Sequence, residues 1–173
     1  MTSPKITVRF EVLGRQHDVS AFDCGRDSLD TYLRDHALSA PAHGLGRSWV
    51  AVDDEHTVLA YYTLSLTTFV RAEAPSRVAK GMPAYPLPAL LLARLTVSRA
   101  VQGQSLGLVS LDAAMKRAFT IARNPDGLPV RALIVHAIDA LAAEFYWKRG
   151  FESSPTNPRH LFMLMKDIEA YFS

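Results

Sequence analysis

Residues 89–107 read ALLLARLTVSRAVQGQSLG, and this stretch decides the fold. The near-continuous apolar run from Ala89 to Val97 predicts a strand that is buried on both faces of a sheet. A turn of small residues follows over Ser98 to Gly107. Behind the turn, Leu111 to Ala122 places apolar residues at helical spacing and predicts a helix with one face on the core. A buried strand that leads through a glycine-bearing turn into a helix is typical of α/β proteins.

The second half of this turn has the composition of a phosphate site. Successive N–H groups at the start of a helix point at one spot and carry the positive end of the helix dipole, so they can hold a pyrophosphate without a lysine. Small side chains let the phosphate approach the main chain. Glycine is also common in any turn between a strand and a helix, so spacing alone leaves the question open. The residues concerned are Gln102, Gly103, Gln104, Ser105, Leu106 and Gly107.

The patterns on either side predict a mixed sheet with crossover helices, in the α/β or α+β class. Helices are expected over Asp27–Ala37 and Asp139–Lys148, each with its aspartate as the N-cap. The proline-rich segment Pro75–Pro88 is predicted to be a loop. Further strands are expected at Ile6–Leu13, Arg47–Val52, Thr57–Phe69, Val130–Ala137, Phe151–Ser154 and His160–Lys166.

Composition predicts one globular domain over residues 1–173, because 49% of the residues are apolar, 21% are charged and no repeat is present. The apolar stretches Val58–Val70 and Met82–Ala93 are shorter than the roughly 20 residues that span a bilayer. No signal peptide is evident and the single Cys24 cannot form an internal bridge, so a reduced, cytoplasmic protein is expected, with Cys24 a small buried thiol. The histidines show no ligand spacing, and no metal site is predicted.

Several blocks of this chain, in order, resemble one family. The hexapeptide Gln102–Gly107 resembles the acetyl-CoA signature of the GNAT superfamily, Gln/Arg-x-x-Gly-x-Gly/Ala, and departs from it at Ser105, where the family has glycine. Within that superfamily the chain is similar to the toxins of GNAT-type toxin–antitoxin modules over nearly its whole length. The other resembling blocks are Phe22–Gly25, Leu29-Asp30 with Tyr32-Leu33, Gly46–Val50, Leu59–Leu64, Met82-Pro83 with Pro86–Pro88, Ala93–Val97, Val135–Ala137, Phe145-Tyr146 with Gly150-Phe151, and Ser153–Pro155.

The resemblance implies an acetyl-CoA-dependent N-acetyltransferase with a mostly antiparallel sheet whose central strands splay apart. It implies that Leu95, Thr96 and Val97 hold the pantetheine arm and that the Gln102–Gly107 turn holds the pyrophosphate. The implied acceptor is the α-amine of an aminoacyl-tRNA, whose acetylation blocks translation. The implied tRNA contacts are Arg77 and Lys80 in the basic loop, with Arg47 and Arg159 as additions. The implied partners are a ribbon-helix-helix antitoxin and a second copy of the chain in a homodimer.

The resemblance also assigns Tyr146, in Phe145-Tyr146-x-x-x-Gly150-Phe151, as the general acid. A phenol with a pKa near 10 stays protonated at neutral pH and can give its proton to a departing thiolate. A general base is less evident, and Glu144, Asp112 and His136 are the residues considered. An α-amine titrates near pH 7.7 and is already partly neutral in the cytosol, whereas a lysine amine near 10.4 calls for a base. The missing base therefore favours an α-amine acceptor.

Three other functions are compatible with parts of this sequence. Gly103-Gln104-Ser105-Leu106-Gly107 reads G-x-S-x-G, the serine-hydrolase elbow, and Asp126 or Asp139 and then His160 follow it in the expected order. Against a hydrolase, Ser98 to Gln102 separate the predicted strand from the turn. A GNAT enzyme for a small amine or a protein N-terminus keeps the fold and changes the acceptor. A module that only binds acetyl-CoA or protein would not need Tyr146.

Overall fold

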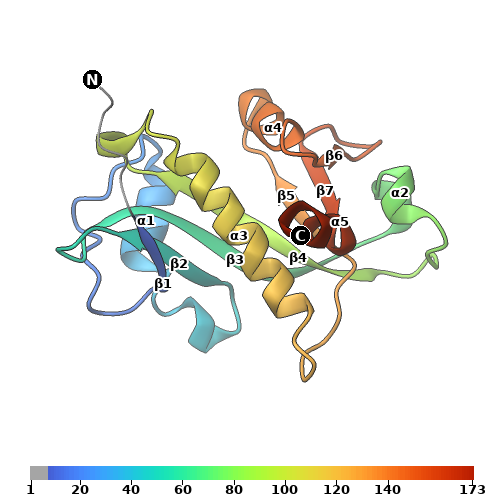
Figure 1. Ribbon diagram of the computed structural model, residues 1–173, viewed down its shortest axis with the longest axis horizontal. Coiled ribbons are helices and arrows are strands. Elements are labelled where there is room, and N and C mark those ends of the chain that lie inside the picture. The colour runs from blue at the N-terminus through green and yellow to red at the C-terminus, as the bar shows by residue number, and fades with distance from the viewer. Residues whose placement is uncertain (1–7) are drawn as a thin grey trace. The chain divides into compact units, whose positions relative to one another are not determined.

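The structure is a computed structural model that describes residues 8–173 (Figure 1). Its helices are α1 (Asp27–Asp35), α2 (Ser76–Ala79), α3 (Leu106–Ala122), α4 (Ala140–Trp147) and α5 (Met165–Phe172). Its strands are β1 (Arg9–Val12), β2 (Arg47–Val52), β3 (Val58–Phe69), β4 (Leu87–Val97), β5 (Ala132–His136), β6 (Glu152–Ser153) and β7 (His160–Leu164). These seven strands form one sheet in the order β1-β2-β3-β4-β5-β7-β6. The predicted mixed α/β class is confirmed.

Pairing within the sheet is mostly antiparallel, as predicted. The pairs β1–β2, β2–β3, β5–β7 and β6–β7 are antiparallel, whereas β4 and β5 run parallel. The parallel register joins Ala89–Leu92 to Ala132–Val135, and β4 continues beyond it to Val97. The register therefore ends five residues before β4 does, because β5 itself ends at His136.

Contacts divide the chain into two compact units. The first unit is Met1–Leu64 with Arg94–Ala114, and the second is Ser65–Ala93 with Met115–Ser173. Buried side chains of α1, β2 and β3 form a core in the first unit, including Leu33, Val50 and Tyr61. In the second unit the core gathers Phe69, Ala74, Val78, Leu87, Ala89, Ala132, Ile134, Phe162 and Leu164. Each unit thus buries apolar side chains of its own.

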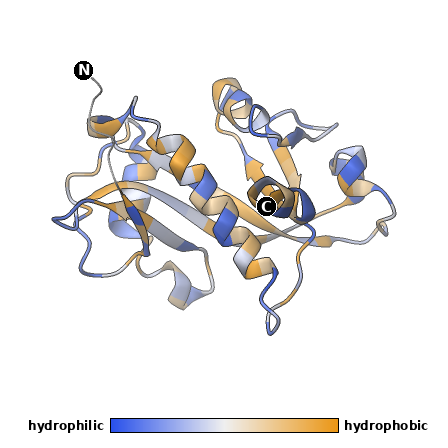
Figure 2. Ribbon diagram, viewed as in Figure 1, coloured by the Kyte–Doolittle hydropathy of each residue, from blue (hydrophilic) through white to orange (hydrophobic). Residues whose placement is uncertain are grey.

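Helix α3 has the core-facing stripe that its sequence predicts. Leu111, Ala114, Met115 and Ala118 are buried, whereas Lys116 is exposed. Hydrophobic and hydrophilic residues accordingly alternate along this helix in Figure 2. Among residues 8–173, no helix has the length and apolar character that crossing a membrane requires.

The last predicted strand, His160–Lys166, is too long. Strand β7 ends at Leu164, and Met165 begins helix α5, which the sequence analysis missed. Met165 and Ile168 are both buried, so the helix presents one apolar face to the core. The run His160–Met165 is continuously apolar after its histidine, and such a run does not reveal where a strand gives way to a helix.

The predicted loop Pro75–Pro88 contains a helical turn, α2, and the start of β4 at Leu87. Pro88 has no N–H to donate, but its carbonyl accepts from the Arg131 N–H at 3.0 Å, so it pairs at the beginning of a strand. The N-cap prediction for Asp27 was wrong, since Arg26 is the N-cap residue and Asp27 the first residue of α1. Helix α3 begins at Leu106, five residues before the predicted Leu111, because its first turn contains Gly107 and Ser110, which do not mark a helix in the sequence. Strand β1 begins at Arg9, after the predicted Ile6, and Ile6 and Thr7 lie outside the described residues. The other helices and strands lie within one or two residues of their predicted bounds.

Candidate functional site

The turn between β4 and α3 lies in the first unit and exposes its backbone. After Val97 the chain forms one 3-10 turn, Arg99–Val101, and then the residues Gln102 to Ser105 are all exposed. A Cβ built on Gly103 or Gly107 would meet nothing within 4 Å, so open space lies over the main chain at both glycines. The first amides of a helix lack intrahelical acceptors. This geometry fits a phosphate group at the start of α3.

Ser105 has a left-handed backbone, with φ +63°, and Gly103 has φ +83°. A left-handed conformation costs a residue with a Cβ roughly 1–2 kcal/mol, and glycine adopts it freely. The glycine of the GNAT signature at the position of Ser105 is thus explained by backbone conformation.

Hydrogen bonds anchor the turn within the first unit. The side chain of Gln102 donates from Nε2 to the carbonyl of Val97 at 3.0 Å and to that of Cys24 at 3.4 Å. The Ser98 N–H donates to the carbonyl of Leu59 at 2.8 Å. Arg99 is joined to Asp23 by an ion pair at 3.1 Å. The Gln102 side chain therefore fixes the turn against the end of β4.

The strand end assigned to pantetheine, Leu95 to Val97, is half-buried. The preceding Arg94 lies over the ring of Tyr32, with its guanidinium carbon 3.3 Å from the ring centroid. Cys24 is buried against the same core as Phe22, as predicted. Burial raises the pKa of the Cys24 thiol, which keeps it neutral at physiological pH.

Tyr146 lies in the second unit, near the end of α4, and only 6% of its surface is exposed. Its ring packs edge-on against Phe145 and Phe151, with centroids 5.2 and 5.7 Å away. Burial raises the pKa of its phenol well above the usual value. Asp139 caps the helix as predicted, accepting from the Ala142 N–H at 2.8 Å. The helix thus holds a protonated phenol in a fixed, apolar setting.

The residues considered as general bases differ in their surroundings. Glu144 is half-exposed and forms an ion pair with Lys148 at 3.2 Å, one helical turn away. His136, at the end of β5, stacks on His160 of β7 with ring centroids 3.9 Å apart. Desolvation, and then the neighbouring His160, lower the pKa of His136, so its imidazole is neutral at pH 7. Asp112 lies on α3 in the first unit and is half-buried.

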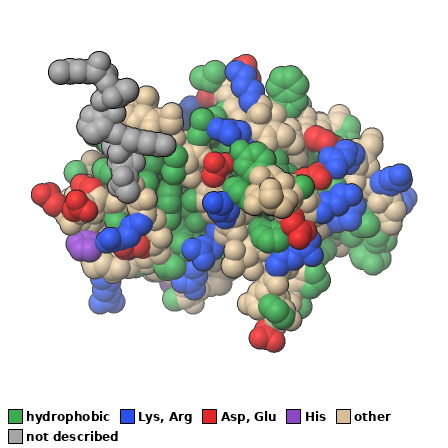
Figure 3. Space-filling model, in the orientation of Figure 1, with side chains coloured by type: hydrophobic (Ala, Val, Ile, Leu, Met, Phe, Trp, Pro, Cys, Tyr) green, Lys and Arg blue, Asp and Glu red, His purple; other side chains and the backbone are tan. Residues whose placement is uncertain are grey.

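The basic residues assigned to tRNA are exposed, but they are not equally available. Arg77 on α2 forms two hydrogen bonds to Asp167, at 2.8 and 3.0 Å, and one to Glu152 at 3.3 Å. Lys80 ends α2 and is exposed. Arg47 is exposed at the start of β2, in the first unit. On the face drawn in Figure 3, acidic side chains lie beside many of the basic ones.

Arg159, the last of the residues assigned to tRNA, donates a hydrogen bond to the carbonyl of Ile138 at 3.2 Å.

The residues named for a serine hydrolase have other contacts. Asp139 is the helix cap, His160 stacks on His136, and seven residues separate the end of β4 from Ser105. A nucleophile elbow requires the serine at a sharp turn directly after the strand. Within residues 8–173, no group of three or more His, Cys, Asp or Glu residues is arranged to hold a metal ion.

The chain is similar to acetylating toxins over most of its length. No family model matches it. The tRNA-acetylating toxin of Mycobacterium tuberculosis is 42% identical over 153 residues, which are 88% of this chain and 89% of that protein. Among solved structures, AtaT complexed with acetyl-methionyl-tRNAfMet matches with a TM-score of 0.85 and 29% identity, over 96% of this chain and 100% of that one.

Two further structures extend this similarity. A tyrosine-to-phenylalanine mutant of KacT matches with a TM-score of 0.85 and 28% identity, over 95% of this chain and 99% of that one. AtaTR bound with acetyl-CoA matches with a TM-score of 0.79 and 28% identity, over 96% and 98% of the two chains. The chain therefore belongs to the family of GNAT-type tRNA-acetylating toxins.

Proposed function

We propose that this protein transfers the acetyl group of acetyl-CoA to the α-amine of an aminoacyl-tRNA and thereby blocks translation. The observation that carries the proposal is the 42% identity to the tRNA-acetylating toxin over 88% of the chain. It is supported by the match to AtaT with acetyl-methionyl-tRNAfMet, a product of that chemistry, and to AtaTR with acetyl-CoA.

In this reaction the neutral α-amine attacks the thioester carbonyl, the new N–C bond forms and the C–S bond breaks. The amine loses a proton and the departing thiolate gains one. Tyr146 is the proton donor in our proposal, because its buried phenol remains protonated at neutral pH. The matching KacT structure carries a tyrosine-to-phenylalanine mutation, as do several of the matching AtaT structures, which supports a role for a tyrosine in this family.

The contacts to acetyl-CoA are assigned to residues of the first unit. We assign the pyrophosphate to the exposed backbone of the Gln102–Gly107 turn, and the pantetheine arm to Leu95, Thr96 and Val97. Gly103 and Ser105 shape the turn through their left-handed backbones. Gln102 acts by holding the turn to Val97 and Cys24, since its side-chain amide is hydrogen-bonded to those carbonyls.

The tRNA contacts are assigned to exposed cations. Arg47 and Lys80 are available for phosphate, and Arg77 becomes available in full only if RNA competes with Asp167 for its guanidinium. The proposal assigns no general base, because an α-amine is already partly neutral at cytosolic pH.

Two partners and a location complete the proposal. AtaT binds the antitoxin AtaR, and the AtaT–AtaR complex binds DNA. We assign this chain a ribbon-helix-helix antitoxin, a homodimeric state and a cytoplasmic location, where charged tRNA is used. Co-purification with the product of an adjacent gene and sedimentation of the isolated toxin test the first two assignments.

The decisive experiment is transfer of labelled acetyl from acetyl-CoA to a pool of charged tRNA, comparing the wild type with Tyr146→Phe. Loss of a positioned proton donor lowers the rate by about 100-fold or more. Tyr85→Phe is the matched control, because Tyr85 is 68% exposed and loses the same hydroxyl.

The outcomes separate the substrate from the mechanism. Label on aminoacyl-tRNA that disappears in Tyr146→Phe alone supports both assignments. Full activity of Tyr146→Phe contradicts the proton-donor role. If acetyl-CoA binds and tRNA stays unlabelled, the acceptor is a small amine or a protein N-terminus.

A further inference from the structure

Arg94, near the end of β4 in the first unit, is a half-buried cation without a polar partner. Across the described part of the chain, residues 8–173, its guanidinium forms no hydrogen bond and no ion pair. None of its nitrogen atoms is fully buried, so a ligand can reach them. A polar group that is partly withdrawn from water usually gains a hydrogen bond in return. Arg94 therefore has unused capacity to bind an acceptor.

The contact that Arg94 does make fixes its orientation. Its guanidinium carbon lies 3.3 Å from the centroid of the Tyr32 ring. Tyr32 belongs to α1 and packs against the core of the first unit. A cation–π contact engages the face of the guanidinium and uses none of its five N–H donors. Arg94 thus holds these donors in a fixed place before any ligand binds.

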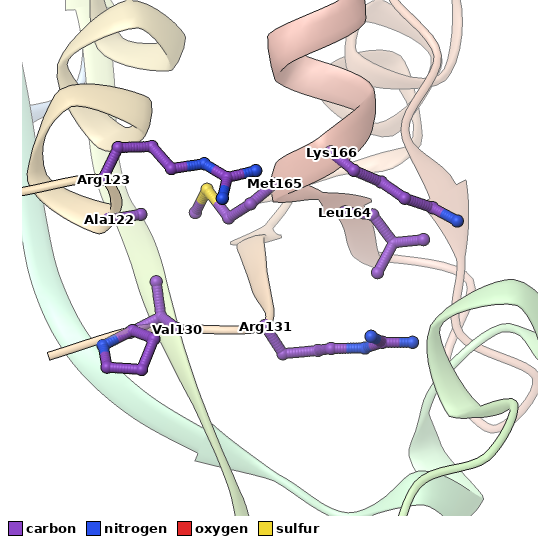
Figure 4. Close-up of a pocket in the computed structure, with 8 residues that line it drawn as sticks. Ala122, Arg123, Val130, Arg131, Leu164, Met165 and Lys166 are labelled. Carbon is purple, nitrogen blue, oxygen red and sulfur yellow. The ribbon is translucent and has the colours of Figure 1, made fainter.

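The arginines beside the cavity of the second unit, drawn in Figure 4, are different. The side chain of Arg131 donates to the carbonyl of Val78 at 3.3 and 3.2 Å. Arg123 forms an ion pair with Glu169 at 2.8 Å. Both guanidinium groups therefore already have an acceptor, whereas that of Arg94 has none.

The position of Arg94 along β4 determines which part of the substrates it can reach. We assigned the pantetheine arm to Leu95, Thr96 and Val97 and the pyrophosphate to the turn that follows, so the arm runs back along the strand toward Arg94. Three residues of strand span about 10 Å, which separates Arg94 from Val97 and from the turn beyond it. Arg94 therefore lies beside the thioester end of acetyl-CoA, where the α-amine of the acceptor must arrive.

We propose that Arg94 binds a phosphate at the 3′ end of the aminoacyl-tRNA, an inference that rests on the proposed function. One amino acid and one ribose join the reacting α-amine to the last phosphodiester of the tRNA, so this phosphate reaches the site together with the amine. A planar guanidinium can donate two parallel hydrogen bonds to a phosphate, which orients the nucleotide as well as attracting it. Acetyl-CoA is the other source of phosphate, and the test distinguishes the two.

The test measures binding of two uncharged tRNAs to the full-length protein by fluorescence anisotropy. One tRNA has an intact 3′ end, and the other lacks its unpaired 3′-terminal nucleotides. Arg94→Gln removes the charge, and Arg94→Lys keeps the charge without the planar fork. Arg15→Gln is the matched control, because Arg15 is exposed and follows β1, which β2 and β3 separate from β4. Acetyl-CoA binding and the melting temperature are measured for every variant, so that a loss of folding is recognised.

A phosphate contact at the 3′ end predicts that Arg94→Gln weakens binding of the intact tRNA about tenfold and binding of the shortened tRNA less than about twofold. Arg94→Lys should weaken binding of the intact tRNA about threefold, and it serves alone if the glutamine variant does not fold. Acetyl-CoA binding stays unchanged in both variants. Arg15→Gln affects the two tRNAs equally.

Three results overturn the inference. Equal weakening of both tRNAs places the contact elsewhere on the RNA, and weaker binding of acetyl-CoA alone assigns the phosphate to acetyl-CoA. Unchanged binding of both substrates leaves Arg94 a structural residue. A wild-type protein that binds acetyl-CoA but neither tRNA contradicts the proposed acceptor and this inference with it, and the labelling assay shows that failure separately.

Discussion

Replacing Ser105 with glycine should stabilise the protein, although it removes a side chain. Ser105 has φ +63°, and a left-handed residue with a Cβ costs roughly 1–2 kcal/mol. Glycine removes that cost, but it adds about 0.4–1 kcal/mol of conformational entropy to the unfolded chain. The net gain is about 0.5–1 kcal/mol, because the serine side chain is exposed and has little packing to lose.

The gain is measurable by urea denaturation or by melting temperature, where about 1–4 °C is expected for a chain of this size. Ser105→Ala is the control, since alanine keeps the Cβ and the strain and should be no more stable than the wild type. Gly103→Ala is the converse, because φ is +83° there and the substitution should destabilise by about 1 kcal/mol. If Ser105→Gly is no more stable than Ser105→Ala, the account of this turn by backbone conformation is wrong.

Three further predictions concern other elements of the fold. Asp139→Ala removes the cap of α4 and should lower the free energy of unfolding by about 0.5–2 kcal/mol, with Asp139→Ser losing much less in the same urea titration. Asp167→Asn weakens the half-exposed pair with Arg77, so stability should change by no more than about 1 kcal/mol, and tRNA binding at low salt should tighten if Arg77 contacts RNA. The pKa of His136 is lower in the folded protein than in the unfolded chain, where it is about 6.5. Neutral His136 therefore contributes fully to the free energy of unfolding above pH 6.5, and this contribution is lost as the pH falls through the folded-state pKa. His136→Asn should flatten that part of the pH–stability curve, and an unchanged curve would show that another group is responsible.

The turn at Gln102–Gly107 was predictable because its signal is local. A buried strand, small residues and an amphipathic helix follow one another within 34 residues, and each has a period or a composition that sequence reveals. Asp139 was recognised as a helix cap for the same reason, since a cap and its helix are neighbours in the chain. Asp27 has an equally suitable side chain, but it is the first residue of α1, and Arg26 is the N-cap residue.

Arg77 illustrates what the sequence did not reveal. It was assigned to tRNA by its place in a basic loop, but its guanidinium is bound to Asp167, which is 90 residues away in the chain. A partner so distant has no signature in local composition.

The sequence by itself determined the fold class, the order of most elements and the turn of small residues before α3, because these depend on periodicity and on residues close together in the chain. The role of Tyr146 was predicted from the resemblance of its motif to that of a known family. Only the tertiary structure decided that Ser105 is left-handed, that Phe145 and Phe151 enclose Tyr146, and that the Arg77 guanidinium is bound to Asp167. Backbone strain, desolvation and ion pairing are set by packing between segments far apart in the chain.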